Sequence, residues 1–296
     1  MYEELEHINL SSLRSIYFIA DFKNILEKVL ENEISADVDL VLRIGSKYII
    51  ESEFENFILL MNKVGINNFS INNSIFLRVF LANSDRFKKS FDHIVEFLNY
   101  LLVNGADVGA EDNISIKIIT QIGYFELFKI LAEYGADIHV DNELPLRMSC
   151  NKGNIEIVRY IINDGANIHI NNEYCLTIAT SYEQYDIVAL LLENGANLHV
   201  GDDICLRTAV KGSCSKTLQY LIDYNADISK ISKDELLICI KEFNPKIIKL
   251  LIDKGVDFSI VNNIKYEHTY NVKETIETLV NNGVDPIQLS YILAVP

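Results

Sequence analysis

The amino-acid sequence predicts an all-α fold in which short helix-turn-helix repeats stack into a solenoid. Two observations lead to this prediction: a Gly-Ala-Asp anchor returns every thirty residues, and two apolar clusters precede each anchor. Clear copies of the anchor begin at Gly105, Gly135, Gly165, Gly195, Asn225 and Gly255. Weaker copies occupy residues 35–38, 65–67 and 283–285, so almost the whole chain follows one repeating pattern.

The apolar run before each anchor predicts the second helix of a repeat. In one repeat Ile157, Val158, Ile161 and Ile162 have the spacing that places apolar side chains on one helix face. The glycine that follows suits the left-handed backbone conformation in which many helices end, and Asn225 is the best tolerated substitute. The Asp or Asn of the anchor is expected to bond its own backbone and fix the turn.

A second apolar cluster upstream of each run predicts the first helix of the repeat. In four successive repeats the clusters contain Leu144, Leu146 and Met148; Tyr174, Leu176 and Ile178; Ile204, Leu206 and Ala209; and Leu236, Ile238 and Ile240. Turn residues at 151–154 and 211–213 separate the two helices. Because isolated helices below ~12 to 15 residues are marginal in water, we expect the repeats to stack and bury their apolar faces.

The charge balance excludes two classes of partner. Lys and Arg total 26 against 42 for Asp and Glu, which gives a formal net charge of -16. Such a surface repels phosphate backbones and anionic lipid headgroups, so we expect neither nucleic acid nor a membrane as a partner. Solubility is the general interpretation of this charge, and an acidic docking surface is the alternative.

The sequence gives no indication of export or membrane insertion. Glu3, Glu4 and Glu6 lie where a secretory signal needs positive charge, and no apolar stretch approaches the ~20 residues that span a bilayer. Five cysteines form an odd set without a CxxC pair, which fits reduced thiols. We therefore expect an intracellular, cytoplasmic protein whose cysteines are small core residues.

Two segments resemble a known repeat family. Residues 153–167, Gly-Asn-Ile-Glu-Ile-Val-Arg-Tyr-Ile-Ile-Asn-Asp-Gly-Ala-Asn, and residues 185–196 resemble the second helix and turn of an ankyrin repeat. The resemblance covers roughly residues 36–285, although the family's Thr-Pro-Leu-His motif is reduced to Pro145-Leu146. It implies an ankyrin-type α-solenoid that acts as a protein-protein interaction scaffold or adaptor and not as an enzyme. A tetratricopeptide or HEAT solenoid is the alternative fold, but neither explains the anchor.

The length of the repeat makes the resemblance to ankyrin repeats more specific. Ordinary ankyrin repeats have ~33 residues, and the count from the anchor to Pro145 places the three missing residues in the loop between repeats. The hairpins between repeats should therefore be short. Thirty-residue units rich in Ile, Asn and Tyr resemble the ankyrin repeat proteins of mimivirus and related giant viruses of amoebae, which implies a host protein as the partner.

Three segments are expected along the chain. Residues 1–35 should form an N-terminal helical cap, residues 36–285 an array of about eight repeats, and residues 286–296 a C-terminal cap. A spacing of forty between Gly65 and Gly105 reveals an insertion at residues 83–92. Longer helices or an elongated turn explain the insertion, and a specific binding site is the alternative.

No residue pattern in the chain indicates a metal site, a cofactor site or a catalytic site. His139, His169 and His199 repeat at thirty residues, but equivalent positions of packed helices are ~8 to 10 Å apart, whereas zinc ligands lie ~2 Å from the metal. For a similar reason we expect no disulfide between Cys175 and Cys205. No GxSxG, HExxH or GxGxxG motif occurs. We therefore predict no metal, no cofactor and no catalytic residue.

Corresponding loop residues of stacked repeats line up along one edge and form an extended concave surface. Here the row is acidic in its middle, and Lys230 and Lys233 interrupt it. Its members are Glu111, Asp112, Asp141, Glu143, Asn171, Glu173, Asp202 and Asp203. We hypothesise that this row binds a basic segment of another protein and that the chain is monomeric. Solvated turn formers are the alternative interpretation of the same residues.

Two other functions stay open at this point. One is an enzyme or regulatory subunit with an unrecognised cleft, and the absence of a catalytic constellation disfavours it. The other is a substrate-binding adaptor of a ubiquitin ligase, for which no F-box segment is visible.

Overall fold

The computed structural model describes residues 38–87, 89–212, 215–241, 245–258 and 280–281. Within these ranges fourteen α-helices and two short 3-10 helices account for all regular secondary structure, and no strand is present. The predicted caps at 1–35 and 286–296 and the last anchor at 283–285 lie outside the described residues.

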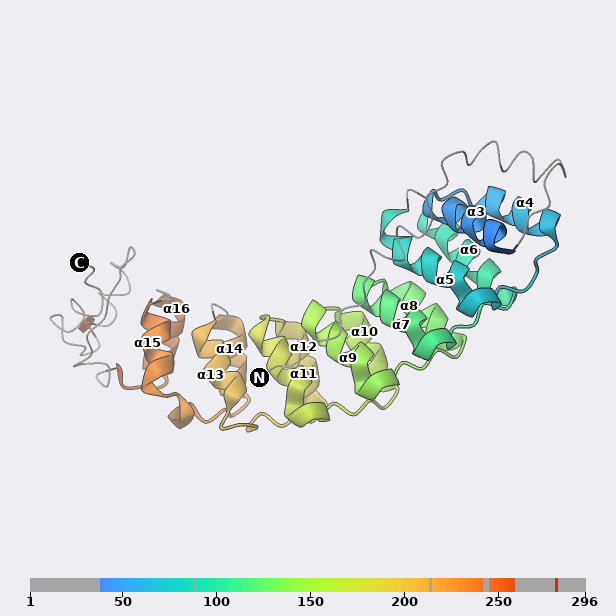
Figure 1. The fold of residues 1–296 in the computed structure, drawn as a ribbon. Coiled ribbons are helices and arrows are strands. Elements are labelled where there is room, and N and C mark those ends of the chain that lie inside the picture. The colour runs from blue at the N-terminus through green and yellow to red at the C-terminus, as the bar shows by residue number, and fades with distance from the viewer. Residues whose placement is uncertain (1–37, 88, 213–214, 242–244, 259–279, 282–296) are drawn as a thin grey trace. The chain divides into compact units, whose positions relative to one another are not determined.

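The chain divides into two compact units, residues 1–166 and 167–296. The described part of the first unit contains four helix pairs (Figure 1). They are α3 (Val38–Ile50) and α4 (Phe54–Val64), α5 (Ile71–Asn83) and α6 (Phe91–Val103), α7 (Ala110–Ile122) and α8 (Phe125–Glu133), and α9 (Val140–Lys152) and α10 (Ile155–Asn163). A 3-10 turn, η1 (Ser84–Arg86), follows α5.

The described part of the second unit contains three helix pairs. They are α11 (Ile170–Ser181) and α12 (Tyr185–Glu193), α13 (Ile204–Lys211) and α14 (Ser215–Asp223), and α15 (Lys233–Lys241) and α16 (Pro245–Asp253). A 3-10 turn, η2 (Ile228–Lys230), precedes α15. From α8 onward the second helices begin at thirty-residue intervals, at Phe125, Ile155, Tyr185, Ser215 and Pro245.

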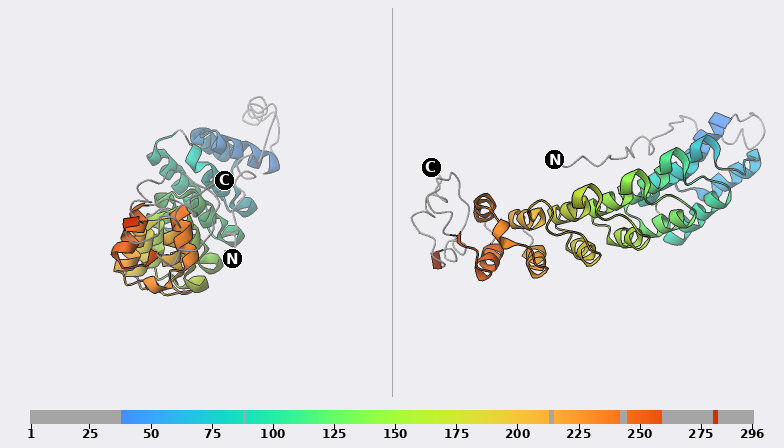
Figure 2. Two further views of the ribbon diagram at one scale, coloured as in Figure 1. Left: turned by 90° about the vertical axis from the view of Figure 1, so that its left-hand side faces the viewer. Right: turned by 90° about the horizontal axis from the view of Figure 1, so that it is seen from below.

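Within each unit the helices form two layers. The first helices pack in chain order, α3 on α5, α5 on α7 and α7 on α9 in one unit, and α11 on α13 and α13 on α15 in the other. Each second helix packs against its own first helix, and α8 also packs on α10, α12 on α14 and α14 on α16. The right-hand view of Figure 2 shows the two rows of helices. The repeat is thus the unit of packing, as the sequence predicted.

The core of the first two helix pairs is aromatic. Phe54 and Phe97 stack with ring centroids 4.2 Å apart, and Phe57 meets Phe76 edge-on at 4.9 Å. Phe69 and Phe80 are also fully buried. From α7 onward leucine and isoleucine dominate the buried positions. Large rings fill the core of these two pairs, because buried volume must be occupied at close-packed density.

The helix ends have the predicted left-handed residues. Gly135 has φ of +91°, and its N–H donates to the carbonyl of Ala132 at 2.9 Å. Asn225 takes the same role with φ of +77°. The alanine that follows Gly135, Ala136, is buried and donates its N–H to the carbonyl of Leu131 at 3.0 Å. The anchor is therefore the hydrogen-bonded end of the second helix.

The insertion at 83–92 lengthens both a helix and a turn. α6 has thirteen residues where α8 has nine, so it begins one helical turn earlier. Before it, η1 and an extended Phe87 replace the two-residue turn that joins α7 to α8. The described residues of this segment therefore form a longer helix and a longer connection than those of α7 and α8.

Among the described helices, none combines the length and the apolar composition needed to cross a bilayer.

Candidate partner-binding surface

All eight candidate residues lie in one kind of turn, at the point where the linker enters the next first helix. Three consecutive residues there have positive φ, between 48° and 62°, at 111–113, 141–143, 171–173 and 201–203. We call these segments the left-handed turns. Asp and Asn tolerate this conformation better than most residues, which explains their abundance. The candidates divide equally between the units: Glu111, Asp112, Asp141 and Glu143 in the first, and Asn171, Glu173, Asp202 and Asp203 in the second.

The anchor carboxylate or amide fixes the linker ahead of each left-handed turn. Asp137 Oδ1 accepts a hydrogen bond from the backbone N–H of His139 at 2.8 Å. Asn167 does the same for His169 at 3.1 Å, and Asn197 for His199 at 3.0 Å. The predicted bond of this residue to its own backbone is therefore confirmed.

The third residue is buried in three of the four left-handed turns, which corrects the expectation that all eight candidates line an exposed row. Glu143, Glu173 and Asp203 are only 9%, 5% and 2% exposed. Each carboxylate contacts Nδ1 of the histidine four residues earlier, at 2.8, 2.6 and 2.7 Å respectively. A buried carboxylate needs hydrogen-bonding partners, and these histidines supply one. These three acids are therefore structural and not available to a partner protein.

The same third position also joins neighbouring repeats. Asp203 Oδ2 accepts from the backbone N–H of Asp227, in the next linker, at 2.8 Å. In the first unit Asn113 Oδ1 accepts from the N–H of Asp137 at 2.9 Å, and Ser74 Oγ accepts from the N–H of Asp107 at 2.7 Å. Hydrogen bonds from side chains to the backbone thus connect successive linkers.

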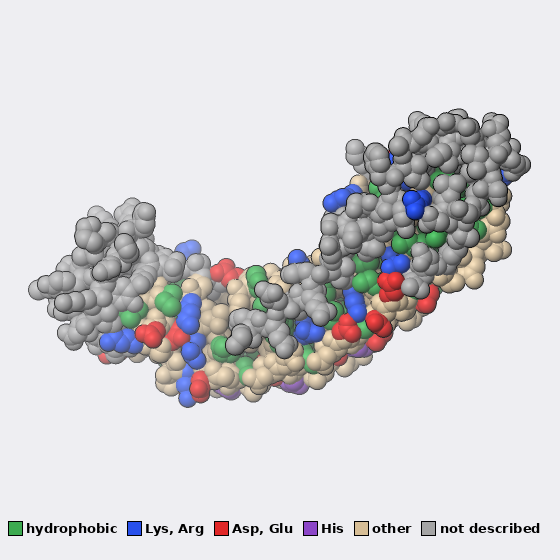
Figure 3. All heavy atoms as spheres, in the orientation of Figure 1, with side chains coloured by type: hydrophobic (Ala, Val, Ile, Leu, Met, Phe, Trp, Pro, Cys, Tyr) green, Lys and Arg blue, Asp and Glu red, His purple; other side chains and the backbone are tan. Residues whose placement is uncertain are grey.

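The remaining five candidates, Glu111, Asp112, Asp141, Asn171 and Asp202, are exposed. Three of them form ion pairs: Arg78 Nη1 lies 2.5 Å from Glu111, Lys117 Nζ 2.5 Å from Asp141, and Lys230 Nζ 3.7 Å from Asp202. The side chains of Asp112 and Asn171 have no hydrogen bond or ion pair with the described residues. Figure 3 shows acidic and basic side chains side by side on the visible face of each unit.

Sequence reasoning missed two features of this surface. The cations of the first helices, Arg78 and Lys117, partly neutralise the acidic row, and this depends on packing between repeats. The pairing of each histidine with an acid four residues later had a visible signal, because both members recur at thirty-residue intervals.

The three repeated histidines do not converge on a metal. In the part of the chain that the structure describes, no group of three or more His, Cys, Asp or Glu side chains has the arrangement of a metal site. Cys150, Cys175, Cys205 and Cys239 are buried free thiols, which confirms the interpretation of these four as core residues. Burial raises the pKa of Cys205 to about 11 despite its hydrogen-bonding contacts with Thr180 and Thr177, so this thiol stays protonated.

His139 has a second acidic partner. Its Nε2 lies 3.1 Å from Asp164 Oδ2, on the opposite side of the ring from Glu143. Burial disfavours the protonated ring, but the hydrogen bonds and negative charges of Glu143 and Asp164 outweigh it and raise the pKa of His139. A raised pKa stabilises the folded state below the unfolded value of 6.5, and the gain is lost as the pH rises through the folded pKa.

A His139→Gln variant should therefore unfold more easily than the wild type near pH ~6, by less than about 1 kcal/mol because the ring is partly exposed. Near pH ~9 the charge-dependent part of this difference should vanish. Urea unfolding at both pH values measures it. An equal loss at the two pH values would show that the charge of His139 plays no part.

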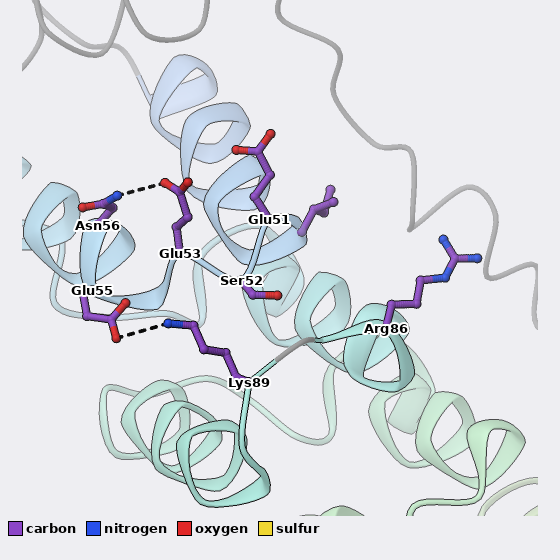
Figure 4. A pocket seen from close by; sticks show the side chains of 8 residues that line it. Glu51, Ser52, Glu53, Glu55, Asn56, Arg86 and Lys89 are labelled. Carbon is purple, nitrogen blue, oxygen red and sulfur yellow. Dashed lines mark hydrogen bonds and ion pairs between the residues drawn. The ribbon is translucent and has the colours of Figure 1, made fainter.

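The insertion lines an open cavity of about 610 Å³ together with the turn between α3 and α4 (Figure 4). Lys89 Nζ lies 3.6 Å from Glu55 Oε1, and Asn56 Nδ2 donates to Glu53 Oε2 at 2.9 Å. Arg86 lines the same cavity. Both signs of charge are present, so the cavity indicates no single class of ligand.

Comparison with known families decides the type of repeat. Residues 89–172 and 116–202 each match the family model for ankyrin repeats in three copies. Together the two matches cover residues 89–202, where the chain is similar to ankyrin repeats. The helix pairs on either side follow the same pattern, so the fold is an all-α, ankyrin-type solenoid. Ankyrin repeats are generally protein-protein interaction modules. No curated protein matches the sequence.

Proposed function

We propose that this protein is a non-enzymatic scaffold that binds another protein through the exposed residues of its left-handed turns. The observation that supports the proposal is the difference in exposure between the residues of each turn. The third residue is buried or half-buried and makes hydrogen bonds within the protein, whereas the first two residues are exposed and have no part in the core. Exposed residues on a rigid repeat scaffold are the positions at which such proteins vary their specificity.

The chemistry of these turns favours a basic segment of the partner. In the first unit Glu111, Asp112 and Asp141 are exposed, and Asp112 has no internal cation. In the second unit Asp202 and Asn171 are the exposed members. A basic side chain would pair with Asp112 directly and would compete with Lys117 for Asp141. The net charge of -16 favours approach of a basic partner at low ionic strength.

The proposal also includes the extent of the array, its oligomeric state and the location of the partner. The array is proposed to extend over residues 36–285, between caps at 1–35 and 286–296, and to act as a monomer. The resemblance to giant-virus ankyrin proteins makes a host protein in the cytoplasm the expected partner.

Replacing both Asp112 and Asp141 by asparagine tests the proposal. Asparagine tolerates positive φ, so the turn should keep its shape while two negative charges are removed. We expect capture of the partner from host lysate at low salt to weaken about tenfold. Binding of purified, identified partner measures this change as a ratio of dissociation constants.

The matched control replaces Glu126 and Glu156 by glutamine. Both are exposed on the second helices α8 and α10, so this variant has the same net charge as the first. Capture should be unchanged. Equal loss in both variants would contradict the acidic-turn proposal, and turnover in an activity screen without any captured partner would contradict the scaffold itself.

A further inference from the structure

A group of tyrosines covers the outer side of α12 and α14, the second helices of two adjacent repeats in the second unit. The rings of Tyr185 and Tyr220 meet edge-on with centroids 5.5 Å apart. Those of Tyr220 and Tyr224 stack at 5.8 Å with an interplanar angle of 29°. Tyr182, in the turn before α12, is 56% exposed. We call Tyr185, Tyr220 and Tyr224, whose rings contact one another, the tyrosine face.

The tyrosine face is partly fixed in place and yet open to solvent. Tyr224 is 42% exposed, and its hydroxyl donates to the carbonyl of Leu192 at 2.7 Å. Tyr185 and Tyr220 are half-buried between the two helices. Aromatic side chains held in one orientation lose little conformational entropy on binding, which is why tyrosine is enriched where proteins meet.

The surroundings of these rings are acidic. Asp186 and Glu193 are exposed on α12, whereas Asp223, at the end of α14, pairs with Lys254 at 3.1 Å. Burial, together with the negative charge of Glu193, raises the pKa of Tyr220. The ring therefore stays neutral and electron-rich at physiological pH, as an acceptor of cations requires.

One cation already occupies this face. Lys216 Nζ lies 3.4 Å from the centroid of the Tyr185 ring. This contact shows that a positive charge from a flexible side chain seats on the ring. A binding partner would therefore have to share the Tyr185 ring with Lys216 or displace Lys216 from it.

We propose that the tyrosine face is a second docking surface, which takes an arginine side chain of a linear segment of a partner protein, with Glu193 and Asp186 supplying the opposing charge. Arginine is favoured over lysine because its planar, weakly hydrated guanidinium stacks on aromatic rings. The surface is separate from the left-handed turns, because Tyr185 and Tyr220 lie on second helices and Tyr224 lies directly after α14.

The repeat architecture provides a matched site for comparison. Phe125 and Tyr160, on α8 and α10 of the first unit, stand where Tyr185 and Tyr220 stand in the second, with centroids 6.0 Å apart. In the first unit the position that corresponds to Tyr224 is occupied by Asp164, which binds His139. Phe125 is therefore a control position with the same geometry and without the extended tyrosine face.

The test measures binding of a short labelled Gly-Arg peptide to the full chain by fluorescence anisotropy, with a Gly-Lys peptide of equal length for comparison. We expect the arginine peptide to bind about threefold more tightly. Tyr185→Leu should weaken its binding about threefold, Tyr185→Phe should retain it, and Phe125→Leu should leave it unchanged.

A gain of affinity gives a second, independent readout. Lys216→Gln should strengthen binding of the arginine peptide about threefold, because it frees the face of Tyr185. Lys249→Gln, an exposed residue of α16, makes the same change in net charge and is the control. Equal effects of the two lysine variants, or equal affinities for the two peptides, would mean that only net charge attracts the peptide and would overturn the proposal.

Discussion

An Asp203→Ala variant is expected to lower the free energy of unfolding of the second unit by about 3 kcal/mol. The carboxylate of Asp203 is 2% exposed and holds both His199 Nδ1 and the backbone N–H of Asp227. Alanine removes both bonds and leaves the amide of Asp227 without an acceptor. Alanine also adopts the φ of +55° less readily than aspartate does.

Two variants separate these contributions. Asp202→Ala lies at the same φ but has an exposed side chain, so it should cost about 1 kcal/mol, the backbone part alone. Asp203→Asn should also cost about 1 kcal/mol or less, because Asn113 accepts the equivalent bond in the first unit. Chemical unfolding gives the free energies, and hydrogen exchange of the Asp227 amide reports the local bond. Equal losses for Asp202→Ala and Asp203→Ala would refute the structural role of the third position.

A Glu235→Gln variant is expected to lose about 3 kcal/mol of stability at neutral pH. Glu235 is 3% exposed at the start of α15. Lys211 Nζ lies 3.1 Å and Arg207 Nη2 lies 3.2 Å from its Oε1, and Ser232 donates to its Oε2. Burial alone would raise the pKa of this carboxyl, but the bonds from Ser232, Lys211 and Arg207 outweigh it and lower the pKa from 4.5 to about 2.

Because the pKa of Glu235 is lowered, we expect the free energy of unfolding to fall at acidic pH, and we call this fall the acid limb. The lowered pKa stabilises the folded state above the unfolded value of 4.5, and the gain disappears as the pH falls to about 2. Unfolding measured across this window should show the limb in the wild type and a weaker one in Glu235→Gln. Asp234→Asn is the control, because Asp234 is the exposed neighbour on the same helix. An unchanged limb in Glu235→Gln would show that other carboxyls cause it.

The buried carboxylate of Glu235 also gives Arg207 and Lys211 an acidic partner inside the second unit. Arg207 and Lys211 of α13 both point at one carboxylate of α15. Their charges join two repeats within the second unit. The sequence contained both signs of charge, but it did not reveal which of them pair inside the protein.

Local properties of the chain were readable from the sequence alone. The period, the two helices of each repeat and the left-handed residue at Gly135 or Asn225 follow from apolar spacing and from the conformational freedom of single residues. These are interactions within about four residues, so each repeat specifies them independently. The lengthened connection at 83–92 was visible for the same reason, as a change in spacing.

The exposure of the candidate residues was decided only by the tertiary structure. Asp202 and Asp203 are adjacent and chemically identical, yet one is exposed and the other is buried against the next linker. The tyrosine face likewise arises from rings on two different repeats. The sequence determined that this protein is a stack of helical repeats, since that depends on local periodicity. Packing between repeats determined which side chains hold the stack together and which ones face a partner.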